Sequence, residues 1–140
     1  VVGFPSPFSV PPVGIPRSFK PSNSFRLGGE LTVLDNPGVD LRAGVNYETS
    51  AIPNDYLTPL TADLNRLTLA VGVGIRPLPK LRLDALYAHV FGFTEEVDPA
   101  TAAVSAVNPV RGNPTTPRPI NGGTYANAGN IFGLGATLQF

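Results

Sequence analysis

The chain has 140 residues, of which 42% are apolar and 14% charged, and its ten basic residues balance ten acidic ones. This balance excludes the basic surface that nucleic-acid binding requires, so we expect no nucleic-acid partner. The absence of cysteine excludes disulfides, thiolate metal sites and cysteine catalysis. The 15 glycines and 16 prolines argue against helices, because both residues destabilise helix interiors.

Five stretches alternate between apolar and polar side chains with the period of two that is typical of a β-strand. In chain order they cover residues 24–34, 39–49, 65–76, 81–92 and 130–140. Each is close to the roughly 9–11 residues that a tilted strand needs to cross a bilayer, whereas an average soluble strand has about 5–6. We interpret the proline-rich residues 1–23 as the remnant of an extracellular loop and residues 24–140 as strands of a barrel.

The connections between these stretches alternate in length. Residues 35–38 and 77–80 are short and carry the Asn, Asp, Pro and Gly of tight turns, whereas 50–64 and 93–129 are long and irregular. Short turns on one side and long loops on the other are typical of outer-membrane barrels. If the chain ends in the periplasm, the two turns are periplasmic and the two long loops extracellular.

The two faces of the predicted strands differ in chemistry. One face carries aliphatic and aromatic side chains, and the other carries glycine, small residues and every charged side chain of the strands. A soluble sandwich alternates in the same way, with its polar face in water, and this alternative stays open. The crowding of glycine and the mixed signs of charge favour the lumen of a membrane barrel. The charged residues of this face are Arg26, Glu30, Asp40, Arg42, Glu48, Arg66, Arg76, Arg82 and Asp84.

Five strands cannot close a barrel that spans a membrane, for which eight is the usual minimum. An open sheet in lipid would leave two unpaired edges at several kcal/mol for each unsatisfied group. The sequence therefore predicts the C-terminal five antiparallel strands of a larger transmembrane β-barrel. The final residue, Phe140, lies on the lipid-facing side of an alternating strand, and we expect it to be the contact for the outer-membrane assembly machinery.

Several segments, taken in order, resemble the C-terminal strands of the outer-membrane long-chain fatty-acid and hydrocarbon transporter family (FadL/TodX type). The resemblance covers about residues 19–140. It rests on FRLGGEL at 25–31, LRAGVNY at 41–47, IPNDYLTP at 52–59, DLNR at 63–66, LDALYAHVF at 83–91, GTY at 123–125 and GLGATLQF at 133–140.

This resemblance implies a 14-stranded barrel in the bacterial outer membrane with a hatch in its lumen. It implies passive uptake of long-chain fatty acids or other hydrophobic compounds, with membrane lipid around the barrel and no cofactor. In this family most ligand-contacting positions lie upstream of the strands seen here. A general porin or surface adhesin is the alternative function, and a soluble all-β binding module is a further one.

Arginines of the charged face are the candidate ligand-binding residues, since a guanidinium binds a carboxylate well. Arg42, nearer the periplasmic end, and Arg66, near the external mouth, are the two candidates for the carboxylate of a fatty acid. The competing interpretation, which we favour, is that these arginines pair with Glu30, Asp40, Glu48 and Asp84 to fill the barrel.

Other residues that could carry chemistry lack partners at a useful spacing. His89 is the only histidine, and it falls on the apolar side near the outer interface. Its isolation argues against a catalytic or metal site. The pair Glu95 and Glu96 with Asp98 could bind a cation, but a solvated acidic loop is the better interpretation. We therefore expect no catalytic residues and no metal site.

Overall fold

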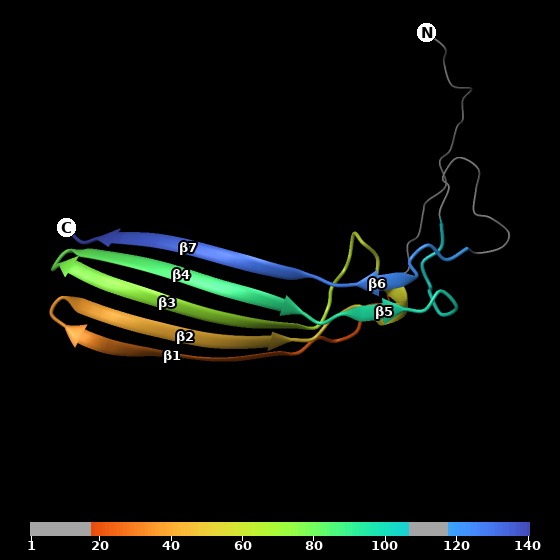
Figure 1. Cartoon of the computed structure of the whole chain (residues 1–140), viewed down its shortest axis with the longest axis horizontal. Coiled ribbons are helices and arrows are strands. Elements are labelled where there is room, and N and C mark those ends of the chain that lie inside the picture. Colours follow the sequence, from red (N-terminus) through yellow and green to blue (C-terminus); the bar gives the residue numbers. More distant parts are fainter. Residues whose placement is uncertain (1–17, 107–117) are drawn as a thin grey trace, which may run out of the picture.

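The computed structural model describes residues 18–106 and 118–140. Five long strands form one antiparallel sheet in the order β1-β2-β3-β4-β7 (Figure 1). This confirms the predicted all-β class and the five antiparallel strands. Most of the predicted loop remnant 1–23 lies outside the described residues. The strands are β1 (Ser24–Asp35), β2 (Gly38–Glu48), β3 (Arg66–Leu78), β4 (Leu81–Gly92) and β7 (Ala128–Leu138).

The connections lie at opposite ends of this sheet according to their length. The β1–β2 and β3–β4 turns lie at the end where β7 finishes, which we call the turn end (Figure 1). The other end, the loop end, carries the 3-10 helix η1 (Asn54–Tyr56) and a two-stranded sheet of β5 (Glu95–Val97) and β6 (Gly123–Tyr125). The long loop predicted to be irregular therefore contains a short strand pair. In the described part of the chain, no helix has the length and apolar character needed to cross a membrane.

The register of the sheet separates apolar from charged side chains. One row across all five strands consists of Leu31, Leu41, Val73, Ala85 and Leu134. The next row consists of Thr32, Asp40, Gly74, Asp84 and Gly135. Because side chains alternate across a sheet, these rows lie on opposite sides. We call them the apolar face and the charged face.

A register shift interrupts the alternation near the turn end of β1. Thr32 pairs with Asp40, and Leu34 pairs with Val39, so that one residue of β1 has no partner on β2. Such an extra residue changes which side chains share a side of the sheet. Simple alternation assigns Leu34 to the charged face, whereas the structure places it opposite an apolar-face residue.

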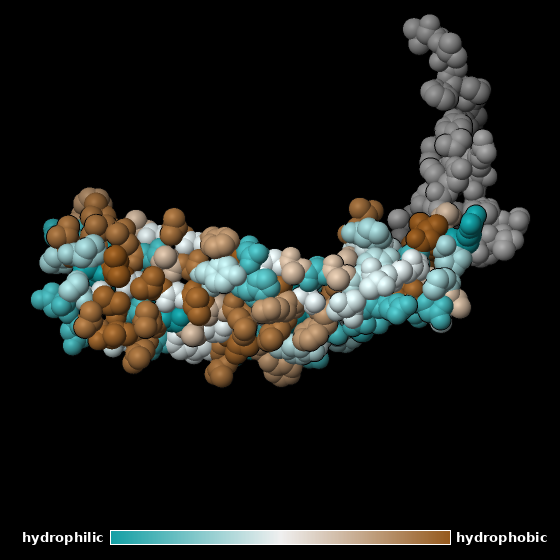
Figure 2. All heavy atoms as spheres, in the orientation of Figure 1, coloured by the Kyte–Doolittle hydropathy of each residue, from teal (hydrophilic) through white to brown (hydrophobic). Residues whose placement is uncertain are grey.

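The apolar face has no protein cover among the described residues. Leu27, Phe132 and Leu134 are 76%, 77% and 91% exposed, and brown apolar side chains spread over the five-stranded sheet in Figure 2. Soluble proteins rarely expose a continuous apolar surface of this kind, because its burial is strongly favourable. Apart from Ala88 on β4, the buried apolar residues form one cluster beyond the loop end of the sheet: Ile52, Leu57, Leu64, Val97 and Ala102.

Candidate functional site

One buried carboxylate lies near the turn end of the charged face. Asp40 on β2 is buried, and its Oδ1 accepts a hydrogen bond of 3.0 Å from the Thr32 hydroxyl. Its Oδ2 accepts from Arg76 Nη2 at 2.8 Å and lies 3.4 Å from Arg82 Nη2 and 3.8 Å from Arg42 Nη2. Three guanidinium groups from three strands therefore share one buried carboxylate.

Arg42 connects this carboxylate to two further acids. Its Nη1 donates to Asp84 Oδ1 at 2.8 Å, and its Nε donates to Glu30 Oε2. Asp84 in turn accepts from Arg82 Nε at 3.1 Å. Three arginines and three acids thus form one network of balanced charge, which we call the six-charge network: Glu30, Asp40, Arg42, Arg76, Arg82 and Asp84.

Glycine provides the space for the six-charge network. Gly74 on β3 lies between Asp40 and Asp84 in the register. A Cβ atom at this position would lie 2.7 Å from Asp84 Oδ1 and 3.2 Å from both Arg42 Nη2 and Arg82 Nη2. A methyl group there would force these side-chain ends to shift, so Gly74 leaves room for the side chains of β2 and β4 to meet over β3.

A second, smaller set of charges lies at the loop end of the same face. Arg66 begins β3, and its Nη2 and Nε lie 2.9 and 3.1 Å from Glu48 Oε2 at the end of β2. Its Nη1 is 3.8 Å from Asp63 Oδ1. Nearby, Arg26 Nε donates to Asn46 Oδ1 at 3.2 Å.

The two predicted ligand-binding residues share a face but lie far apart. Arg42 pairs with Gly72, which lies six positions after Arg66 on β3. At about 3.4 Å per residue this corresponds to roughly 20 Å along the sheet. The structure therefore does not combine Arg42 and Arg66 into one site. Each contacts acidic side chains, in line with the favoured interpretation that the arginines pair with acids.

Beyond the loop end, the two long loops pack into one unit. Buried Asn121 donates from Nδ2 to the carbonyl oxygens of Asp55 and Leu57 at 2.7 and 2.9 Å, and its Oδ1 accepts from Val104 N at 3.0 Å. The two bonds to Asp55 and Leu57 join residues more than sixty positions apart. The sequence analysis missed this loop unit. The apolar residues within the two loops are the feature of the sequence that could have indicated it.

The acidic residues Glu95 and Asp98 accept hydrogen bonds from other residues of the loops. Glu95 Oε2 accepts from Asn54 Nδ2 at 2.8 Å, and Asp98 Oδ1 accepts from Ala100 N at 2.8 Å. Within residues 18–106 and 118–140, no three His, Cys, Asp or Glu side chains group as metal ligands would.

His89 lies on the apolar face with polar and aromatic neighbours. Its Nδ1 is 2.8 Å from Asn130 Oδ1, which also accepts from the Tyr87 hydroxyl at 2.9 Å. Its ring centroid is 4.2 Å from that of Phe91. Amphipathic and aromatic rings of this kind gather where a membrane meets water.

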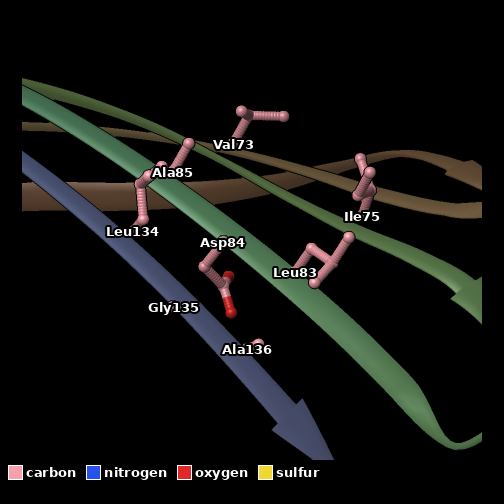
Figure 3. Close-up of a pocket in the computed structure, with 8 residues that line it drawn as sticks. All are labelled: Val73, Ile75, Leu83, Asp84, Ala85, Leu134, Gly135 and Ala136. Atoms are coloured by element: carbon pink, nitrogen blue, oxygen red, sulfur yellow. The ribbon is translucent and has the colours of Figure 1, made fainter.

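Shallow hollows mark the apolar face where its side chains are small. One of about 470 Å³ is lined by Val73, Leu83, Ala85 and Leu134, among others. In Figure 3 the side chains of Val73 and Ala85 extend to one side, and the Asp84 carboxylate extends away from them. The apolar face is thus hollowed at this position, and the charged side chain nearest to the hollow extends away from the apolar side chains that line it.

Comparison with known proteins identifies relatives of the chain. Residues 11–140 match the family described as outer membrane protein transport protein (OMPP1/FadL/TodX). Over 94 residues, the chain is 32% identical to the 47 kDa outer membrane protein of Pasteurella multocida (strain Pm70). That alignment covers 64% of this chain and 21% of the relative, so the chain spans about a fifth of the relative's length. No solved structure matches the chain significantly.

Proposed function

Because the chain belongs to the OMPP1/FadL/TodX family of outer membrane transport proteins, we propose that it forms part of a passive pathway for hydrophobic compounds. Membership in this family confirms the predicted location in the bacterial outer membrane. It also confirms the prediction that the protein is not an enzyme, since the family consists of transport proteins. Strands outside this chain would close the barrel, because β1 and β7 are each paired along one edge only in the described residues.

The separation of the two faces is the observation that carries this proposal. A continuous apolar face suits contact with lipid tails, and the charged face suits the interior of a barrel. Inside, the six-charge network of the turn end presents charged groups that are paired with one another. Such a wall offers an apolar solute no favourable contact, so we expect the solute to be bound nearer the loop end.

We propose long-chain fatty acids as the substrate class and Arg66 as the residue that meets their carboxylate. Arg66 lies at the loop end, where an external ligand arrives first. Its Nη1 has only a distant partner, 3.8 Å away on Asp63. Arg42 is the weaker candidate, because its guanidinium already faces Glu30, Asp40 and Asp84.

Uptake by cells that depend on this protein in their outer membrane tests the proposal. We expect saturable uptake of a radiolabelled fatty acid and of the matching uncharged fatty alcohol. Substituting Arg66→Gln should lower fatty-acid uptake several-fold and leave fatty-alcohol uptake unchanged, since only the acid carries a carboxylate. Arg26→Gln, on the same face and at the same end, is the matched control and should leave both rates unchanged.

The outcomes separate the substrate class from the transport function. Equal loss of acid and alcohol uptake in Arg66→Gln would contradict a carboxylate contact. Uptake of small polar solutes without saturable uptake of either lipid would contradict the pathway for hydrophobic compounds and support a general porin.

A further inference from the structure

A small hollow of about 170 Å³ lies at the turn end, apart from the proposed ligand position at the loop end. Its polar lining consists of Arg76, Lys80, Arg82, Thr137 and Gln139. The β3–β4 turn and the segment after β7 meet here, and Gln139 N donates to the Lys80 carbonyl at 2.9 Å. The hollow is thus formed by segments that contact each other directly.

The side chains that line this hollow offer hydrogen-bond donors and include no acid. Three of them are cations, and no Asp or Glu lines the hollow among the described residues. Asp40 and Asp84 pair with the two arginines from outside the lining, so Lys80 carries the charge that these acids do not balance. The lining therefore favours an anionic ligand.

The two arginines have donors to spare and are held in place. Arg76 uses Nη2 on Asp40, and Arg82 uses Nε on Asp84. In the described part of the chain, neither Nη1 group donates a hydrogen bond, and Lys80 forms no ion pair. Since Asp40 and Asp84 already hold the guanidinium groups, little conformational entropy is lost when a ligand binds to their remaining donors.

We propose that this hollow, which lies on the charged face and so inside the barrel, binds a free oxyanion such as inorganic phosphate. Arg76 and Arg82 present planar guanidinium donors that match the oxygens of such a group, and Lys80 adds a mobile charge. Thr137 and Gln139 supply a hydroxyl and an amide as further donors. This inference is independent of the proposed substrate, because its residues lie at the opposite end of the strands from Arg66.

Amine labelling of the protein in detergent micelles tests the proposal. The reactivities of Lys80 and Lys20, the two lysines of the chain, are compared by peptide mass spectrometry after brief acylation. Inorganic phosphate is compared with chloride at equal ionic strength. We expect phosphate to slow labelling of Lys80 several-fold and to leave Lys20, which lies at the loop end, unchanged.

Two further arms test the location of the hollow and the role of the lining. The protein is labelled in phosphatidylcholine vesicles with and without phosphatidylglycerol and without added phosphate, and protection of Lys80 that requires phosphatidylglycerol would overturn the proposal, because a lipid headgroup would not reach the barrel interior. The substitution Thr137→Val removes one donor without touching the six-charge network, and it should weaken the protection of Lys80. Equal labelling of Lys80 under all conditions would overturn the proposal. So would full protection without any added anion, because another part of the protein would then fill the hollow.

Discussion

Arg42 on β2 donates a hydrogen bond of 2.8 Å to Asp84 on β4, across the intervening strand β3. Nearest-neighbour strands are about 4.8 Å apart, so side chains that meet from strands on either side of a third need room at the position of the middle strand that they cross. Gly74 of β3 is that position. The charged face is therefore stabilised by an interaction that depends on glycine as much as on charge.

The first prediction concerns this glycine. Replacing Gly74 by alanine puts a methyl group 2.7 Å from Asp84 Oδ1, so the carboxylate and the nearby guanidinium groups must shift, and we expect a loss of about 0.5–1.5 kcal/mol of stability through weakened hydrogen bonds. The measurement is the temperature at which the protein in detergent loses its compact, fast-migrating gel band. Gly44→Ala is the matched control, because a Cβ there meets its nearest atom at an ordinary 3.6 Å. Equal midpoints for the two variants would contradict the account.

The second prediction concerns the shared carboxylate. Asp40→Asn removes the charge that faces three arginines, and we expect a loss of about 1–3 kcal/mol. This is less than for a fully buried ion pair, because the arginines remain a third to a half exposed. Asp35→Asn, at an exposed position of β1, should change the same unfolding midpoint little. Indistinguishable midpoints would show that Asp40 does not organise the network.

The alternation of the sequence is sufficient to predict the sheet, and the reason is physical. A period of two appears wherever one side of a strand is apolar and the other is polar, whatever the partner strand. It does not specify the register shift that brings Leu34 opposite Val39, because a bulge is a property of the strand pair.

The candidate site was predicted less fully than the sheet. Sequence alone identifies the arginines and acids of the charged face, but it does not show that Asp40 is shared by three of them. That arrangement depends on the register of three strands and on Gly74. The loop unit was missed for a similar reason, since Asn121 bonds to residues more than sixty positions away.

The third prediction concerns the loop unit. Asn121→Ala leaves the carbonyl groups of Asp55 and Leu57 without their donor, at a local cost of about 1–3 kcal/mol. We expect faster cleavage of the loops by an added protease, with an unchanged unfolding midpoint for the strands. Asn54→Ala, which removes one exposed hydrogen bond to Glu95, is the control and should be cleaved at the original rate. Unchanged cleavage in Asn121→Ala would show that the loops are held together by other contacts.

The fourth prediction concerns the apolar face. Leu134→Arg places a charge among lipid tails, and we expect a loss of about 2–4 kcal/mol if this row lies near the middle of the bilayer. Leu86→Arg is the control on the charged face, where Leu86 lies opposite Gly72 and Gly133 and a charge can reach polar neighbours. Refolding into lipid vesicles and unfolding by denaturant measure both. A larger loss for Leu86→Arg would reverse the assignment of the two faces.

The assignment of the faces to lipid and lumen is tested most directly by single cysteines along β4. The chain contains no native cysteine, so each variant carries one labelling site. With a fluorophore at each of positions 82 to 87 in the protein in vesicles, we predict that labels at 83, 85 and 87 are quenched by brominated lipid. Labels at 82, 84 and 86 should instead be quenched by a water-soluble quencher. Quenching that does not alternate, or that alternates in the opposite phase, would contradict the membrane-spanning sheet described here.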